Sequence, residues 1–169
     1  MTLVIRDETA ADAGPIGDVT VAAFATLPVS GHTEQFIIAA LRVAGALTIS
    51  LVAELEGQVV GHIAFSPVTV DGQFTGWYGL GPLAVAPAHQ RQGIGRALVE
   101  EGLARLRQLG ARGCCLVGHP EYYRRLGFDN FPGLLLEHVP PEVFLAQTFD
   151  GAVPQGVVEF HEAFGATGP

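Results

Sequence analysis

The sequence predicts an α+β domain in which helices flank a largely antiparallel sheet. Apolar residues that alternate with polar ones, or run continuously, indicate three successive strands. Turn signals at Glu56-Gly57 and Asp71-Gly72 separate these strands and favour hairpins. A helical spacing of apolar residues follows from 93 to 109. The three strands are expected at residues 47–55, 59–69 and 76–86.

The length of 169 residues suits one domain, residues 1–169, with a single core. Apolar residues make up 49% of the chain, which excludes disorder over most of it. The formal net charge is −8, which argues against nonspecific binding to nucleic acid or an anionic membrane. All nine basic residues are arginines, so a Walker A lysine and a Schiff-base lysine are excluded.

A short strand at residues 3–6 and two helices are expected before the hairpins. Thr9 and Asp12 fit a capping box for the first helix, and residues 28–31 break the chain after it. The inward face of this helix is expected to carry Ile16, Val19, Ala23 and Phe24.

Residues 36–53 are apolar enough to resemble a membrane span, but Arg42 lies near the middle. The apolar period changes at Gly45 from helical to alternating. We therefore expect a soluble helix followed by a strand, and no membrane span. The stripe of the second helix consists of Phe36, Ile37, Ala40 and Leu41.

The strand at 76–86 contains Gly79, Gly81 and Pro82, which a regular ladder resists, so a bulge or splay is expected there. The following helix is expected to end at Gly110. Its apolar face consists of Ile94, Leu98, Val99, Leu103, Leu106 and Leu109. Later elements are expected at 114–117 (strand), 120–126 (helix), 143–149 (strand) and 156–161 (strand).

The segment Gln-Arg-Gln-Gly-Ile-Gly, residues 90–95, joins a strand to a helix N-terminus. Such an end presents unpaired N–H groups and partial positive charge, and Gly93 and Gly95 allow a phosphate to approach the backbone. Arg91 and Arg96 add positive charge, so a diphosphate ligand fits. The dinucleotide fingerprint fails at its third glycine. A turn in which glycines serve only packing remains an alternative.

A second motif, GHPEYYRRLGF, covers residues 118–128. Together with LGPLAVAP and HQRQGIGRAL it makes the chain resemble the GNAT superfamily of acetyl-CoA-dependent N-acetyltransferases over nearly its whole length. The likeness is to a bacterial branch of small, mostly uncharacterised members. It implies the GNAT fold, a central mixed and mostly antiparallel sheet flanked by helices.

The resemblance also implies roles for residues. The strand Leu83-Ala84-Val85 would splay from its neighbour and bind the pantetheine arm through its backbone, with the Val85 N–H polarising the thioester carbonyl. Tyr123, four positions before Gly127-Phe128, matches the proton donor to the leaving thiolate. The diphosphate would be held by the turn, consisting of Gln90, Arg91, Gln92, Gly93, Ile94, Gly95 and Arg96.

Two features complicate the catalytic assignment. Adjacent helix positions diverge by about 100°, so we assign Tyr123 to chemistry and Tyr122 to packing or the substrate wall. The alternative is that both tyrosines are aromatic residues of the core. The strand at 76–86 has no acidic residue to act as base, so the amine proton would leave through water, backbone carbonyls or another residue. His119 is a candidate base, although a histidine in a turn is more often structural.

Other chemistries find little support. No histidine spacing fits a metal site, no serine lies in a nucleophile elbow, and Cys114-Cys115 fits buried packing in a reducing compartment. His62, within an apolar strand, is expected to hydrogen-bond across the sheet.

The resulting hypothesis is a cytoplasmic enzyme that moves acetyl from acetyl-CoA to a primary amine, on a small molecule or a protein, without metal, nucleic acid or membrane. Residues 12–45 and 129–164 would frame the acceptor site, and a homodimer stays open. The alternative function is a non-catalytic module that binds or senses acyl-CoA. Residues 91–125 hold seven arginines against three glutamates, a basic module where the CoA polyanion would dock.

Overall fold

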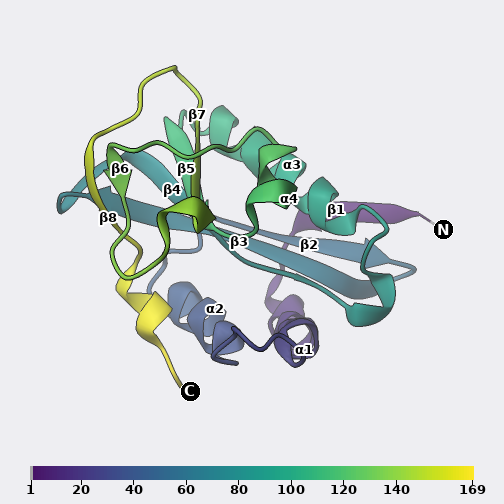
Figure 1. The fold of residues 1–169 in the computed structure, drawn as a ribbon. Helices are drawn as coiled ribbons and strands as arrows, with labels where there is room; N and C mark the ends of the chain where they lie inside the picture. The colour runs from purple at the N-terminus through teal and green to yellow at the C-terminus, as the bar shows by residue number, and fades with distance from the viewer. Residues whose placement is uncertain (1) are drawn as a thin grey trace.

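The computed structural model describes residues 2–169. Its centre is an eight-stranded sheet in which six strands follow the order β1-β2-β3-β4-β5-β7, while β8 pairs with β3 and β6 with β8 (Figure 1). The strands are β1 (Leu3–Asp7), β2 (Ile49–Leu55), β3 (Gln58–Val70), β4 (Gln73–Val85), β5 (Gly113–Val117), β6 (Leu134–Leu135), β7 (Phe144–Thr148) and β8 (Gly156–Glu159). The α-helices are α1 (Ala13–Phe24), α2 (Glu34–Val43), α3 (Ile94–Gln108) and α4 (Pro120–Arg124).

The strand pairing confirms the predicted mixed, mostly antiparallel sheet. The strands β1 to β4 form three consecutive antiparallel pairs, and β7 is antiparallel to β5. Within residues 2–169, only β4 with β5 and the short pair of β6 with β8 run parallel. The helix α3 occupies the connection between β4 and β5, as a parallel crossover requires.

The helices cover the sheet on its two faces (Figure 1). α3 packs against β2 and β3 from one side, and α1 and α2 lie on the other side. The largest core cluster lies beneath α3, where the Phe65 ring fills the space beside Gly102. The described part of the chain contains no helix long and apolar enough to cross a membrane.

β4 contains the irregularity that the sequence predicts. Ile63 lies opposite Leu83 while Phe65 lies opposite Leu80, so β4 has one more residue than β3 over this stretch. The parallel pairing with β5 covers only residues 77–79 of β4. Beyond them β4 continues to Val85 without pairing to β5, and the two strands splay apart as expected.

Some boundaries differ from expectation. Leu109 was placed on the apolar face of α3, but this is wrong, because the helix ends at Gln108 and Leu109 is 59% exposed. The capping pair is confirmed at a 3₁₀ turn, residues 10–12, directly before α1: the Asp12 carboxylate accepts the Thr9 N–H at 2.7 Å and pairs with Arg6. β8 ends at Glu159, earlier than the predicted 161.

A partly buried polar network connects Glu8, which follows β1, with α2, β2 and β3. The Arg42 guanidinium donates to both carboxylate oxygens of Glu8, at 2.9 and 3.0 Å. The Ser50 hydroxyl also donates to Glu8 and lies 2.8 Å from Nε2 of His62. Because the only Ser50 proton points to Glu8, His62 must donate its Nε2–H, which confirms its predicted cross-sheet hydrogen bond.

The position of His62 determines its titration. Its side chain is fully buried, and this burial lowers its pKa to about 4. The unfolded chain, with a histidine pKa of about 6.5, takes up a proton that the folded chain refuses. The free energy of unfolding therefore falls as the pH drops from 6.5 toward 4. Glu8 adds to this below its usual pKa: its burial raises the pKa, but hydrogen bonds from Arg42 and Ser50 outweigh burial and lower it overall.

We predict that wild type loses about 3 kcal/mol of unfolding free energy between pH 7 and pH 4 because of His62. The His62→Gln variant should lose less over that range, since glutamine does not titrate. Urea unfolding at several pH values measures this, with the exposed His119→Gln as control. Equal pH slopes for wild type and His62→Gln would show that His62 titrates freely in the fold.

We also predict opposite effects for two glycine substitutions in helices. A Cβ on Gly102 would overlap the Phe65 ring, so Gly102→Ala should lower the unfolding free energy by about 1–3 kcal/mol. A Cβ on Gly17 in α1 meets nothing within 4 Å, so Gly17→Ala should raise it by about 0.5–1 kcal/mol. Denaturant titration of both variants checks the pair, and a stabilising Gly102→Ala would contradict the packing described.

Candidate functional site

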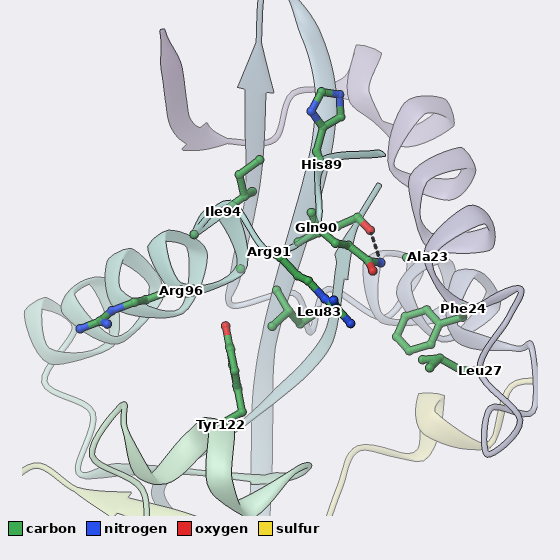
Figure 2. A pocket seen from close by; sticks show the side chains of 13 residues that line it. Ala23, Phe24, Leu27, Leu83, His89, Gln90, Arg91, Ile94, Arg96 and Tyr122 are labelled. Carbon is green, nitrogen blue, oxygen red and sulfur yellow. Dashed lines mark hydrogen bonds between the residues drawn. The ribbon is translucent and has the colours of Figure 1, made fainter. Parts of the chain in front are cut away.

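The candidate site begins where the chain leaves the end of β4 and turns into α3. A 3₁₀ turn at residues 87–89 leads into the loop, and the Gln90 side-chain amide donates to the Val85 carbonyl at 3.1 Å (Figure 2). Arg91 and Gly93 both adopt positive φ, 64° and 85°, and Gly93 is the N-cap of α3. The left-handed backbone at Gly93 explains why glycine is needed there.

The first turn of α3 leaves backbone donors free. The Ala97 N–H bonds to the Gly93 carbonyl at 3.0 Å and opens the intrahelical ladder. The N–H groups of Ile94, Gly95 and Arg96 precede that bond and have no intrahelical acceptor. Together with the positive end of the helix dipole, these free donors are suited to bind an anion.

A cavity of about 470 Å³ lies between this turn and the C-terminal end of α1 (Figure 2). Its floor is the splayed half of β4, and α4 borders it through Tyr122. The lining residues are Ala23, Phe24, Leu27, Leu83, Val85, His89, Gln90, Arg91, Gly93, Ile94, Gly95, Arg96 and Tyr122.

The two arginines of the turn differ in direction. Figure 2 shows the Arg91 side chain reaching into the middle of the cavity, toward Leu83 and Phe24. The Arg96 side chain points away along α3, where its Nε donates to Glu100 at 3.1 Å. Both side chains are exposed, so Arg91 is the guanidinium available to an anion in the cavity.

The two tyrosines of α4 have separate environments. Tyr122 is 40% exposed, and its hydroxyl lies 3.1 Å from where a Cβ on Gly95 would be. Tyr123 lies deeper: its ring meets Tyr122 edge-on at 4.9 Å between centroids and Phe128 at 5.8 Å. Burial raises the pKa of both phenols, and more strongly that of Tyr123.

The structure brings together most of the residues predicted for the site. Eight of them line the cavity, namely Leu83, Val85, Gln90, Arg91, Gly93, Ile94, Gly95 and Arg96. Ala84 is buried on the other face of β4, and neither Gln92 nor Tyr123 lines the cavity. Ala23 and Leu27 fall within residues 12–45, which were expected to frame the acceptor site, but neither was singled out as a site residue, and His89 was not predicted. Of these, Leu27 carries a signal, because it follows the apolar stripe of α1 by one turn.

Other candidate groups lie apart from the cavity. His119 is exposed at the N-cap of α4 and is not among the lining residues. Cys114 and Cys115 are fully buried free thiols, and burial raises the pKa of each. Residues 2–169 hold no cluster of three or more His, Cys, Asp or Glu side chains that could bind a metal ion.

Curated relatives match the middle of the chain. The family model described as acetyltransferase (GNAT) domain matches residues 47–130. The uncharacterized N-acetyltransferase YhbS of Escherichia coli is 44% identical over 97 residues. That match covers 57% of this chain and spans 58% of the relative's length.

Two solved structures match nearly the whole chain. A GNAT family acetyltransferase from Brucella melitensis, in complex with acetyl-CoA, is 50% identical with a TM-score of 0.88, covering 96% of this chain and 98% of its own. YhbS from Escherichia coli, in complex with CoA, is 34% identical with a TM-score of 0.87, covering 98% and 93%. The shared fold, the splayed strands and these identities lead to one conclusion: the chain belongs to the GNAT family of acetyltransferases.

Proposed function

We propose that this chain transfers an acetyl group from acetyl-CoA to a primary amine. The observation that carries the proposal is one cavity that joins an anion-binding helix N-terminus to the unpaired edge of β4. The relatives of known structure were crystallised with acetyl-CoA or CoA, which supports the same ligand here.

The residues of the cavity fit acetyl-CoA in two places. The N–H groups of Ile94, Gly95 and Arg96, with the Arg91 guanidinium, suit a diphosphate. The absence of a Cβ at Gly95 leaves room beside the Tyr122 hydroxyl. Leu83 and Val85 offer an apolar surface with exposed backbone for the pantetheine arm.

The direction of the Val85 N–H supports an oxyanion role. The neighbouring Ala86 N–H donates to the Val60 carbonyl of β3 at 2.8 Å. Strand backbone alternates in direction, so the Val85 N–H points to the opposite edge of β4, into the splay. A thioester carbonyl placed there would gain a hydrogen bond as negative charge develops on its oxygen.

The proposed reaction is direct transfer. The neutral amine nitrogen attacks the thioester carbon, a C–N bond forms, and the C–S bond breaks. Tyr123 gives its phenolic proton to the departing sulfur and regains a proton from water, which also takes up the amine proton. Burial raises the Tyr123 pKa, so this phenol carries its proton at neutral pH. Positioning and the Val85 N–H supply the remaining acceleration.

We predict that Tyr123→Phe lowers kcat for acetyl transfer by about 100-fold or more, because the leaving thiolate loses its proton donor. Tyr122→Phe is the matched control: it should raise KM for acetyl-CoA and leave kcat nearly unchanged. Release of CoA thiol under saturating amine measures both variants. Loss of kcat in Tyr122→Phe alone would assign the proton donor to Tyr122, the tyrosine that lines the cavity.

A second candidate function is a non-catalytic module that binds acyl-CoA. The separation of Tyr123 from the cavity lining favours it. Such a module would bind CoA through the same turn and release no thiol with any amine.

Both functions predict CoA binding through Arg91. CoA at 100 times its Kd should raise the unfolding free energy of wild type by about 2.7 kcal/mol. The gain should shrink in Arg91→Ala and persist in Arg125→Ala, an exposed arginine outside the cavity. Thermal denaturation with and without CoA checks this. An equal CoA effect in wild type and Arg91→Ala would exclude Arg91 from the binding site.

A further inference from the structure

The cavity has two chemically different walls. Its charged side chains, Arg91 and Arg96, both come from the phosphate-binding turn. The facing wall is the end of α1 and the segment after it, which presents Ala23, Phe24 and Leu27 (Figure 2). Among the described residues that line the cavity, none has a carboxylate side chain.

Three acidic residues of the neighbouring elements lie outside this lining. Glu34 at the start of α2 is turned back on its own loop, where the Ser30 hydroxyl lies 2.9 and 2.8 Å from its two carboxylate oxygens. Glu8 is paired with Arg42. Asp18 on α1 borders a separate depression, together with Asp12.

This distribution selects among amines. A polyamine carries further ammonium groups, which would lie beside apolar side chains and a guanidinium with no carboxylate to pair with. Such an ammonium would lose part of its hydration and gain no ion pair from a side chain of the lining. An aromatic or branched alkyl group would instead gain by leaving water against Phe24 and Leu27.

We infer that the acceptor is a primary amine on an aromatic or branched alkyl group, without a second positive charge. This inference rests on the proposed acetyl transfer. Phe24 and Leu27 contact the apolar group and set the KM for the amine. The reactive nitrogen lies toward β4, where the thioester is placed.

The test measures CoA thiol release at saturating acetyl-CoA with four amines: phenethylamine, isopentylamine, spermidine and Nα-acetyl-lysine amide. Phenethylamine and isopentylamine should give kcat/KM values about tenfold or more above spermidine, which carries further ammonium groups, and above Nα-acetyl-lysine amide, whose amine sits on a linear chain that ends in two polar amides. Phe24→Ala and Leu27→Ala should raise KM for the apolar amines by about tenfold and leave KM for acetyl-CoA within about twofold. Phe24→Leu keeps an apolar side chain and should recover part of the loss.

Val21→Ala and Val29→Ala are the controls, on the same helix and loop but outside the lining. Val29 is 94% exposed, so its substitution should leave both KM values unchanged. Preference for spermidine or the lysine amide would overturn the inference and leave the acetyl transfer intact. If Phe24→Ala and Leu27→Ala raise KM for acetyl-CoA and not for the amine, this wall contacts the pantetheine arm. That result would also overturn the inference. If none of the four amines supports thiol release, the proposed function itself would be overturned.

Discussion

Three residue pairs hold β4 beside β5, and the end of that pairing at Gly79 and Cys115 determines the arrangement of the whole site. An extra residue on β4 turns its ladder near Gly81 and Pro82, and proline has no N–H to give to a neighbour. The released edge of β4 then faces outward up to Val85. α3 begins nine residues later, so its positive end lies beside an unpaired strand. The cavity therefore lies between an unpaired strand edge and the start of a helix.

The two faces of the sheet serve the site differently. The face under α3 is apolar and rigidly packed, which fixes the direction of the helix and therefore of its N–H groups. The opposite face contains the Glu8, Arg42, Ser50 and His62 network, which ties α2 to β2 and β3. These directional hydrogen bonds constrain α2, the helix that follows the cavity wall formed by Ala23, Phe24 and Leu27. The basic module expected at residues 91–125 is not gathered at the cavity: Arg91 and Arg96 line it, whereas Arg105 pairs with Asp7 and Arg112 with Asp150.

Local patterns were enough to predict the order of the main elements, because the periods of α2, α3 and the three long strands are strong. The turn at residues 90–95 was also predicted from local sequence, since two closely spaced glycines at the start of a helix indicate a turn with accessible backbone N–H groups. Leu109 was misplaced because periodicity does not say where a helix stops. The partners of His62 come from segments 12 to 54 residues away in the chain, and no local pattern indicates such contacts. Leu27 and Ala23 join the cavity only through the packing of α1 on β4, which depends on the whole fold.

The ion pairs of this fold are built without lysine. Arg6 with Asp12, Arg42 with Glu8, Arg105 with Asp7 and Arg112 with Asp150 all use guanidinium groups. An acyl thioester modifies amines and removes their charge, whereas a guanidinium stays protonated and is a poor nucleophile. Because the sequence contains no lysine, no lysine side chain of this chain is open to acylation by a thioester. The guanidinium groups keep their positive charge, and with it these ion pairs, in the presence of a thioester.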